Sequence, residues 1–136
     1  KVHTNYELKP RYRSPAELVR EFHAKAGHPS TEDDDGIELR RTLIEEEFFE
    51  VDDELWSLAN KEDGSLTQTA KELADLVYVV YGTADYLGID LDKVLEAVHA
   101  SNMTKFDPET GKPFYREDGK VTKGPYYKAA DLSFLE

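Results

Sequence analysis

The chain has 136 residues, the usual size of one domain, so we expect a single domain over residues 1–136. Its 17 Lys and Arg residues stand against 29 Asp and Glu residues. The resulting net charge of −12 disfavours binding to nucleic-acid polymers and to anionic membranes. The chain contains no cysteine, which excludes disulfides, cysteine nucleophiles and thiolate zinc sites. Any metal must therefore be held by oxygen or imidazole ligands.

The sequence also predicts a cytoplasmic protein. Its longest apolar run, residues 76–81, is far shorter than the roughly 20 residues that a membrane-spanning helix needs. No cleavable signal precedes the first predicted helix. We therefore expect neither a membrane nor an extracellular location.

Apolar residues recur at helical spacing in four segments, which predicts an all-α fold. The segments, in chain order, are residues 15–26, 37–60, 66–86 and 91–101. Ser14, Pro15 and Glu17 form an N-terminal capping signature before the first segment, and Asp90 is placed to cap the last. Extended chain is expected over residues 1–13 and a polar acidic loop over residues 28–36, because neither segment shows the helical period.

The sequence changes character after Asn102. Residues 104–128 combine glycines and prolines with six Lys or Arg against four Asp or Glu, so this segment carries a net charge of +2. We expect a helical core over about residues 14–103, followed by a basic loop and tail over residues 104–136 with a hairpin near residues 117–120. Loops of this length inside a domain are usually functional or disordered.

Two pairs of carboxylates lie on the apolar faces of predicted helices. At 100° per residue, the apolar positions of the second helix span an arc of about 140°, and Glu47 lies inside this arc. Glu50, three residues later, lies at its edge, so both side chains project from the face expected to be buried. The third helix is apolar nearly all round over residues 73–81, and Glu72 and Asp75 interrupt this surface with the same spacing.

These carboxylates point to a metal. Ionised carboxylates in apolar surroundings are costly unless they are paired or bound to a cation. The basic residues that adjoin the two pairs are Arg40, Arg41 and Lys71. Four carboxylates from two neighbouring helices suit a hard divalent cation such as Mg²⁺ or Mn²⁺, the alternative being a solvated glutamate-rich face. A di-iron centre needs two Glu-x-x-His motifs and is disfavoured, because the chain has one, at Glu96 and His99.

Three short motifs, taken together, resemble the all-α nucleoside triphosphate pyrophosphohydrolases. They are LIEEEFFE at residues 43–50, ELAD at 72–75 and SNMTK at 101–105. The resemblance covers about residues 14–128 and is to the MazG-like enzymes, which include relatives of dimeric dUTPases and of phosphoribosyl-ATP pyrophosphohydrolase. Their signature is Glu-Glu-x-x-Glu followed by Glu-x-x-Asp, and it matches here at Glu46, Glu47, Glu50, Glu72 and Asp75.

The resemblance implies a four-helix MazG-like bundle completed by oligomerisation, with a long C-terminal tail. It also implies hydrolysis of a (deoxy)nucleoside triphosphate to the monophosphate and diphosphate, with (d)GTP or dUTP leading and the base preference open. Mg²⁺, for which Mn²⁺ could substitute, would be held by Glu47, Glu50, Glu72 and Asp75, where it would lower the pKa of an attacking water. Glu46 would orient or deprotonate that water as the catalytic residue.

The same resemblance places nucleotide-binding groups after the fourth helix. The residues expected to bind substrate are Asn102, Lys105, Arg116, Lys120 and Lys123, with His23 and Tyr78 contributing to a base pocket. For the basic residues there is a physical reason, since the substrate carries several negative charges and the rest of the protein is acidic. The alternative is that they are solvated, or that the tail clasps another subunit.

The third predicted helix gives a separate reason to expect a homodimer or homotetramer. Four short helices in one chain cannot cover a helix that is apolar all round. Two other functions remain open at this point. One is phosphoribosyl-ATP hydrolysis in histidine synthesis, and the other is a non-catalytic helical assembly protein whose acidic faces keep it in solution.

Overall fold

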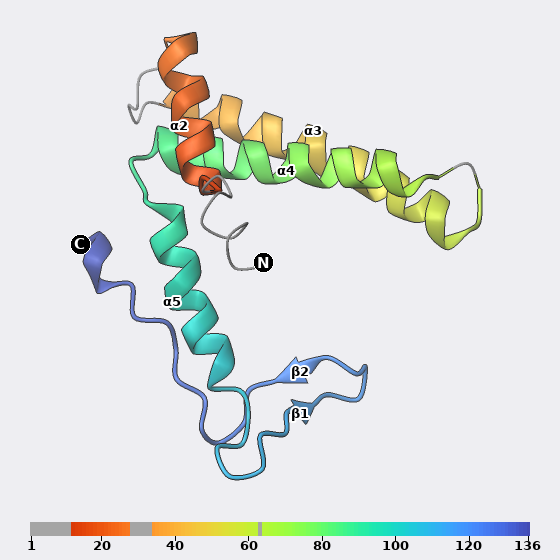
Figure 1. Ribbon diagram of the computed structural model, residues 1–136, viewed down its shortest axis with the longest axis vertical. Helices are drawn as coiled ribbons and strands as arrows, with labels where there is room; N and C mark the ends of the chain where they lie inside the picture. The colour runs from red at the N-terminus through yellow and green to blue at the C-terminus, as the bar shows by residue number, and fades with distance from the viewer. Residues whose placement is uncertain (1–11, 28–33, 63) are drawn as a thin grey trace, which may run out of the picture. The chain divides into compact units, whose positions relative to one another are not determined.

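The computed structural model describes residues 12–27, 34–62 and 64–136, and its chain divides into two compact units. The first unit runs from Lys1 to Gly88 and holds helices α2 (Pro15–Ala26), α3 (Asp34–Ala59) and α4 (Leu66–Tyr86). The second unit runs from Ile89 to Glu136 and begins with helix α5 (Leu91–Met103). Its other elements are the strands β1 (Phe114–Tyr115) and β2 (Val121–Thr122) and a 3₁₀ turn, Ser133–Leu135 (Figure 1).

The all-α prediction and its four helices are confirmed. The helices expected over 15–26 and 66–86 have the predicted ends, and the last helix continues two residues beyond 101 to Met103. The predicted loop over 28–36 was wrong at its end, because α3 already begins at Asp34. Acidic residues such as Asp35 favour the first turn of a helix, where they face the positive end of its dipole. The predictions for residues 1–11 and 28–33 lie outside the described residues.

Side chains cap the helices where the sequence predicts. The Ser14 hydroxyl accepts a hydrogen bond from the Glu17 backbone N–H at 3.2 Å, and the Glu17 carboxylate accepts one from the Ser14 N–H at 3.0 Å. Asp90 accepts from the Lys93 N–H at the start of α5. These bonds satisfy backbone donors that a helix start would otherwise leave unpaired, so the starts of α2 and α5 are stabilised by neighbouring residues in the sequence.

The first unit is built around α4, which packs against both α2 and α3. Val19 of α2 is 1% exposed and Val51 of α3 is buried. The unit also buries polar side chains. His23 Nδ1 lies 2.7 Å from Asp85 Oδ2, and the Arg40 guanidinium stands 5.5 Å from the centre of the Tyr86 ring. Part of the interior is therefore polar, and it positions α2 and α3 on α4 through polar contacts as well as apolar ones.

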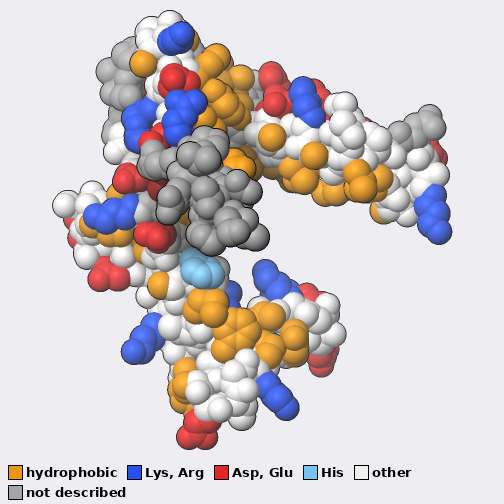
Figure 2. Space-filling model, viewed as in Figure 1, with side chains coloured by type: hydrophobic (Ala, Val, Ile, Leu, Met, Phe, Trp, Pro, Cys, Tyr) orange, Lys and Arg blue, Asp and Glu red, His pale blue; other side chains and the backbone are white. Residues whose placement is uncertain are grey.

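Many large apolar side chains of the first unit are exposed. Leu73 and Val77 on α4 are 45% and 47% exposed, and they line an apolar groove of about 370 Å³ with Leu18 of α2. Figure 2 shows hydrophobic side chains along one edge of the α3–α4 pair, with charged side chains on the opposite edge. No helix of the described residues is long and apolar enough to cross a membrane.

In the second unit the basic segment forms the predicted hairpin and then returns to its helix. Strands β1 and β2 are antiparallel, with Phe114 opposite Thr122 and Tyr115 opposite Val121. Beyond the hairpin, the Lys128 carbonyl accepts a hydrogen bond from the Ser101 hydroxyl at 2.6 Å. The tail is thus tied to the end of α5 by a residue 27 positions away in the sequence.

Candidate active site

Three acidic side chains meet where α3 packs on α4. One carboxylate oxygen from each of Glu47, Glu72 and Asp75 lies within 4.8 Å of the others. Glu72 and Asp75 are three residues apart on α4, so they share one face of that helix, and Glu47 reaches them from α3. We call these three residues the acidic triad. Its spacing and its oxygen ligands suit a divalent cation.

Glu72 is the most constrained member of the triad. It is 1% exposed, although it is a carboxylate. Its Oε1 accepts a hydrogen bond from Gln68 Nε2 at 3.1 Å, whereas its Oε2 is buried and has no hydrogen-bond partner among the described residues. Buried polar atoms nearly always have a partner, and a buried ionised oxygen is especially costly without one. This orphaned oxygen fits a bound divalent cation.

The remaining predicted ligand, Glu50, lies beside the triad. Its side chain is exposed, but it approaches Glu72 closely enough to share a hydrogen bond once it takes up a proton. That contact, followed by the negative charge of Glu72, raises the pKa of Glu50. Three of the four predicted metal ligands therefore form a cluster, and the fourth is placed at its edge.

The negative charges of the triad affect the ionisation of the groups around them. The pKa of Glu47 is raised, first by desolvation and then by the charges of Asp75 and Glu72. The pKa of the Lys71 ammonium is raised as well, by hydrogen bonds to Asp75 and then to Glu72, so the same carboxylates that oppose ionisation of Glu47 favour the charged form of Lys71. Among the described residues, the cluster is thus a site of net negative charge with the exposed Lys71 ammonium at its rim.

The other site residues predicted in the first unit, Glu46, His23 and Tyr78, are not members of the acidic triad. Glu46 is exposed on α3 next to Glu47, and its negative charge contributes to the raised pKa of Glu47. His23 is buried against Asp85. Tyr78 is 39% exposed, lines the apolar groove and meets the Phe22 ring edge-on at 5.7 Å. The catalytic role of Glu46 and the substrate-binding roles of His23 and Tyr78 stay predictions.

The predicted nucleotide-binding residues of the tail all lie in the second unit. Asn102 is exposed near the end of α5, and Lys105 is half-buried just beyond it. Arg116 donates a hydrogen bond from Nε to Asp118 at 3.2 Å, which lowers the pKa of that carboxyl. Lys120 is exposed, and the Lys123 ammonium stands 4.8 Å from the centre of the Tyr127 ring. Their role toward a nucleotide also stays a prediction.

Two partners of the triad were not assigned a role from the sequence. Gln68 and Lys71 precede Glu72 and Asp75, respectively, by four residues, which places each beside its partner on α4. The spacing was readable in the sequence. The sequence also predicts apolar surroundings for Glu72. What it could not show is that Glu72 is only 1% exposed, so that the contact with Gln68 is made to a buried carboxylate.

Comparison with known families adds to this geometry. The family model described as phosphoribosyl-ATP pyrophosphohydrolase matches residues 17–102, more than half of the chain. The chain belongs to this family. It is therefore a member of the MazG-like all-α nucleoside triphosphate pyrophosphohydrolases and is identified as a pyrophosphohydrolase. The matched residues include the acidic triad and Asn102 and end before the basic tail. No curated protein matches the chain.

The raised pKa of Glu50 predicts how the thermal stability of this protein in EDTA depends on pH. A carboxyl whose pKa is raised by folding supports stability below its ordinary pKa of 4.5 and loses that support as pH rises through the raised value. In EDTA, we expect Glu50→Gln to melt a few degrees higher than the unmodified chain at neutral pH, with the difference vanishing below pH 4.5.

Thermal melts over this pH range check the prediction, with Glu45→Gln as the control. Glu45 is another exposed glutamate of α3, outside the triad. Equal gains for both variants, or a gain for Glu50→Gln that persists at the acidic end, would contradict a specific contact between Glu50 and Glu72.

Proposed function

We propose that the protein is a Mg²⁺-dependent hydrolase that converts a (deoxy)nucleoside triphosphate and water to the monophosphate and diphosphate. The observation that carries the proposal is the acidic triad, in which a buried Glu72 oxygen lacks a partner among the described residues. A phosphate chain binds to proteins chiefly through cations. A cluster of carboxylates can serve such a substrate only by holding a metal between them.

The residues present fit Mg²⁺. Glu47, Glu72 and Asp75 would hold it, with Glu50 completing the ligand set from the edge. A bound Mg²⁺ supplies neutralisation of phosphate oxygens and a lower pKa for an attacking water. Glu46, exposed beside Glu47, would accept the proton of that water. The water oxygen attacks the α-phosphorus, the bond to the bridging oxygen breaks, and diphosphate leaves with the bonding electrons.

Binding of the nucleotide itself would involve side chains outside the triad. We propose that Tyr78, which lines the apolar groove between α2 and α4, contacts the base, and that His23 contributes to the base pocket. The residues proposed to contact phosphates and sugar are Asn102, Lys105, Arg116, Lys120 and Lys123. A polyanionic substrate needs such cations, since the chain carries a net charge of −12.

Two substrates compete within this proposal. The printed name of the matching family favours phosphoribosyl-ATP. Residues 118–127 of the tail resemble a compact subgroup described as phosphoribosyl-ATP pyrophosphohydrolase-like, but that label describes sequence likeness and does not fix the substrate. Nucleoside triphosphates, with (d)GTP and dUTP leading, are the other candidates. Both reactions release diphosphate by attack at the same kind of phosphorus, so the triad serves either. Membership of an enzyme family disfavours the non-catalytic assembly protein.

A substrate panel tests the proposal. Diphosphate release in Mg²⁺ should occur with at least one of the dNTPs, NTPs or phosphoribosyl-ATP. It should fall by roughly 100-fold or more in Glu47→Ala and in Asp75→Ala, because each loses a ligand of the metal. Glu45→Gln is the matched control and should retain full activity. Activity that survives in both alanine variants would contradict the triad as the centre, and the best substrate decides between the two readings.

We further propose that the chain works as a homodimer or homotetramer. The exposed apolar side chains of α2 and α4 support this, because a stable monomer rarely leaves such a continuous face uncovered. We expect the unmodified chain to sediment as a dimer or tetramer, and Val77→Glu to shift it toward monomer. Thr67→Glu places the same charge at an exposed polar position of α4 and should change nothing. A monomeric unmodified chain would refute the proposal.

A further inference from the structure

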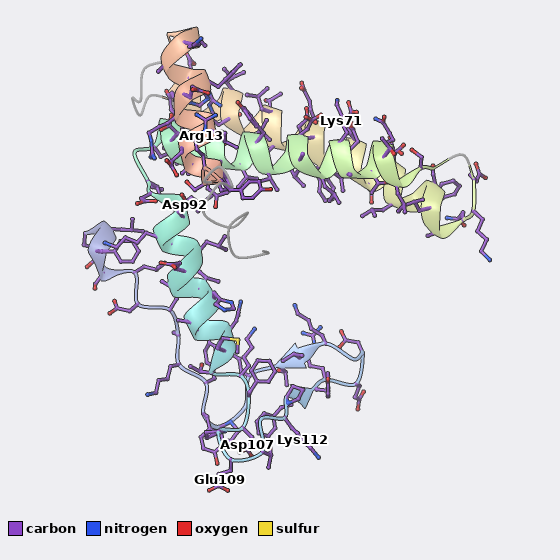
Figure 3. The ribbon with its side chains drawn as sticks, in the orientation of Figure 1. Arg13, Lys71, Asp92, Asp107, Glu109 and Lys112 are labelled. Carbon is purple, nitrogen blue, oxygen red and sulfur yellow. The ribbon has the colours of Figure 1, made fainter. Side chains whose placement is uncertain are left out.

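Lys71 is a cation seated on the oxygens of the acidic triad. Its ammonium Nζ lies 2.7 Å from Asp75 Oδ2 and 3.4 Å from Glu72 Oε1. Figure 3 labels this side chain on α4, at the α3–α4 pair. The two carboxylates that it contacts are members of the triad, so the ammonium and a divalent cation would compete for the same two residues.

The two kinds of cation differ in how well they serve this site. Lys71 brings one charge on a side chain that is 64% exposed, and exposed pairs of this kind contribute little stability. It also leaves Glu72 Oε2 without a hydrogen-bond partner in the part of the chain that the structure describes. A divalent ion brings twice the charge and can reach oxygens on several carboxylates at once. The ammonium of Lys71 therefore binds Asp75 and Glu72 weakly, and a divalent ion can replace it there.

We propose that Lys71 is the counter-cation of the metal-free centre, and that a divalent ion must displace its ammonium from Asp75 and Glu72 in order to bind. Lys71 thereby weakens metal binding while it holds the metal-free triad together. The proposal rests on the proposed function for the metal site and adds to it the residue that sets metal affinity. The four-carbon stem and the exposure of Lys71 let the ammonium turn into solvent without moving α4.

Metal binding without nucleotide tests this directly. Free Mn²⁺ is measured by electron paramagnetic resonance during titration of the unmodified chain, Lys71→Met, Lys71→Arg and Lys61→Met. Lys61 is an exposed lysine of the same unit, so its variant controls for the change in net charge. We expect Lys71→Met to bind Mn²⁺ roughly 5-fold more tightly than Lys61→Met, because metal binding no longer has to break an exposed ion pair, which contributes up to about that factor.

Lys71→Arg should change the affinity in the other direction. A guanidinium pairs with carboxylates through a planar fork and is harder to displace than an ammonium, so Mn²⁺ should bind more weakly than to the unmodified chain. In EDTA, Lys71→Met should melt below Lys61→Met, and saturating Mn²⁺ should remove that difference. The arginine variant keeps the charge, so it tests the proposal even if Lys71→Met folds poorly.

Two outcomes would overturn the inference. If the unmodified chain binds Mn²⁺ but Lys71→Met binds it no more tightly than Lys61→Met does, Lys71 does not compete with the metal, while the proposed metal site stands. If none of the proteins binds Mn²⁺, the metal site itself fails and the role of Lys71 fails with it.

Discussion

The burial of the Glu72 carboxylate is the feature that makes the acidic triad require a cation. A charged side chain that is 1% exposed needs compensating contacts. Gln68 and Lys71 contact its Oε1, whereas Oε2 has no hydrogen-bond partner among the residues that the structure describes. Glu47 and Asp75 increase the negative charge around it rather than relieving it. An arrangement of this kind destabilises an empty protein and stabilises a cation-bound one. We therefore attribute the loss of stability from burying Glu72 to the function of the site, because proteins commonly depart from stabilising patterns at functional sites.

The helix that carries most of the site also leaves part of its apolar surface exposed. Helix α4 carries two triad residues on one side, while Leu73 and Val77 on another side remain about half exposed. One helix thus presents both the metal ligands and the face proposed for a second copy. In such an arrangement, association of subunits would also stiffen the helix that positions the ligands. Catalysis and assembly would then depend on the same element.

Local features were predictable from the sequence, and long-range ones were not. The start of α2 follows from Ser14 and its neighbours, and the position of Glu47 follows from the period of one helix. The same period places Glu50 at the edge of the apolar arc, where it is found exposed. The depth at which a carboxylate is buried depends on how two helices pack, so the near-complete burial of Glu72 could not be calculated from the period of its helix. The contact between His23 and Asp85 joins residues 62 positions apart, and no local pattern announces it. The family match covers residues 17–102, which contain most of the four helices, and it does not include the basic tail.

The central claim is that the acidic triad binds a divalent ion. The most direct test is an anomalous difference map from crystals of the unmodified chain grown with Mn²⁺. If the triad binds the ion, the map will contain a peak within bonding distance of carboxylate oxygens of Glu47, Glu72 and Asp75, and the Lys71 ammonium will no longer lie on Asp75. A map whose peaks lie only elsewhere, with Lys71 still seated on Asp75, would contradict it.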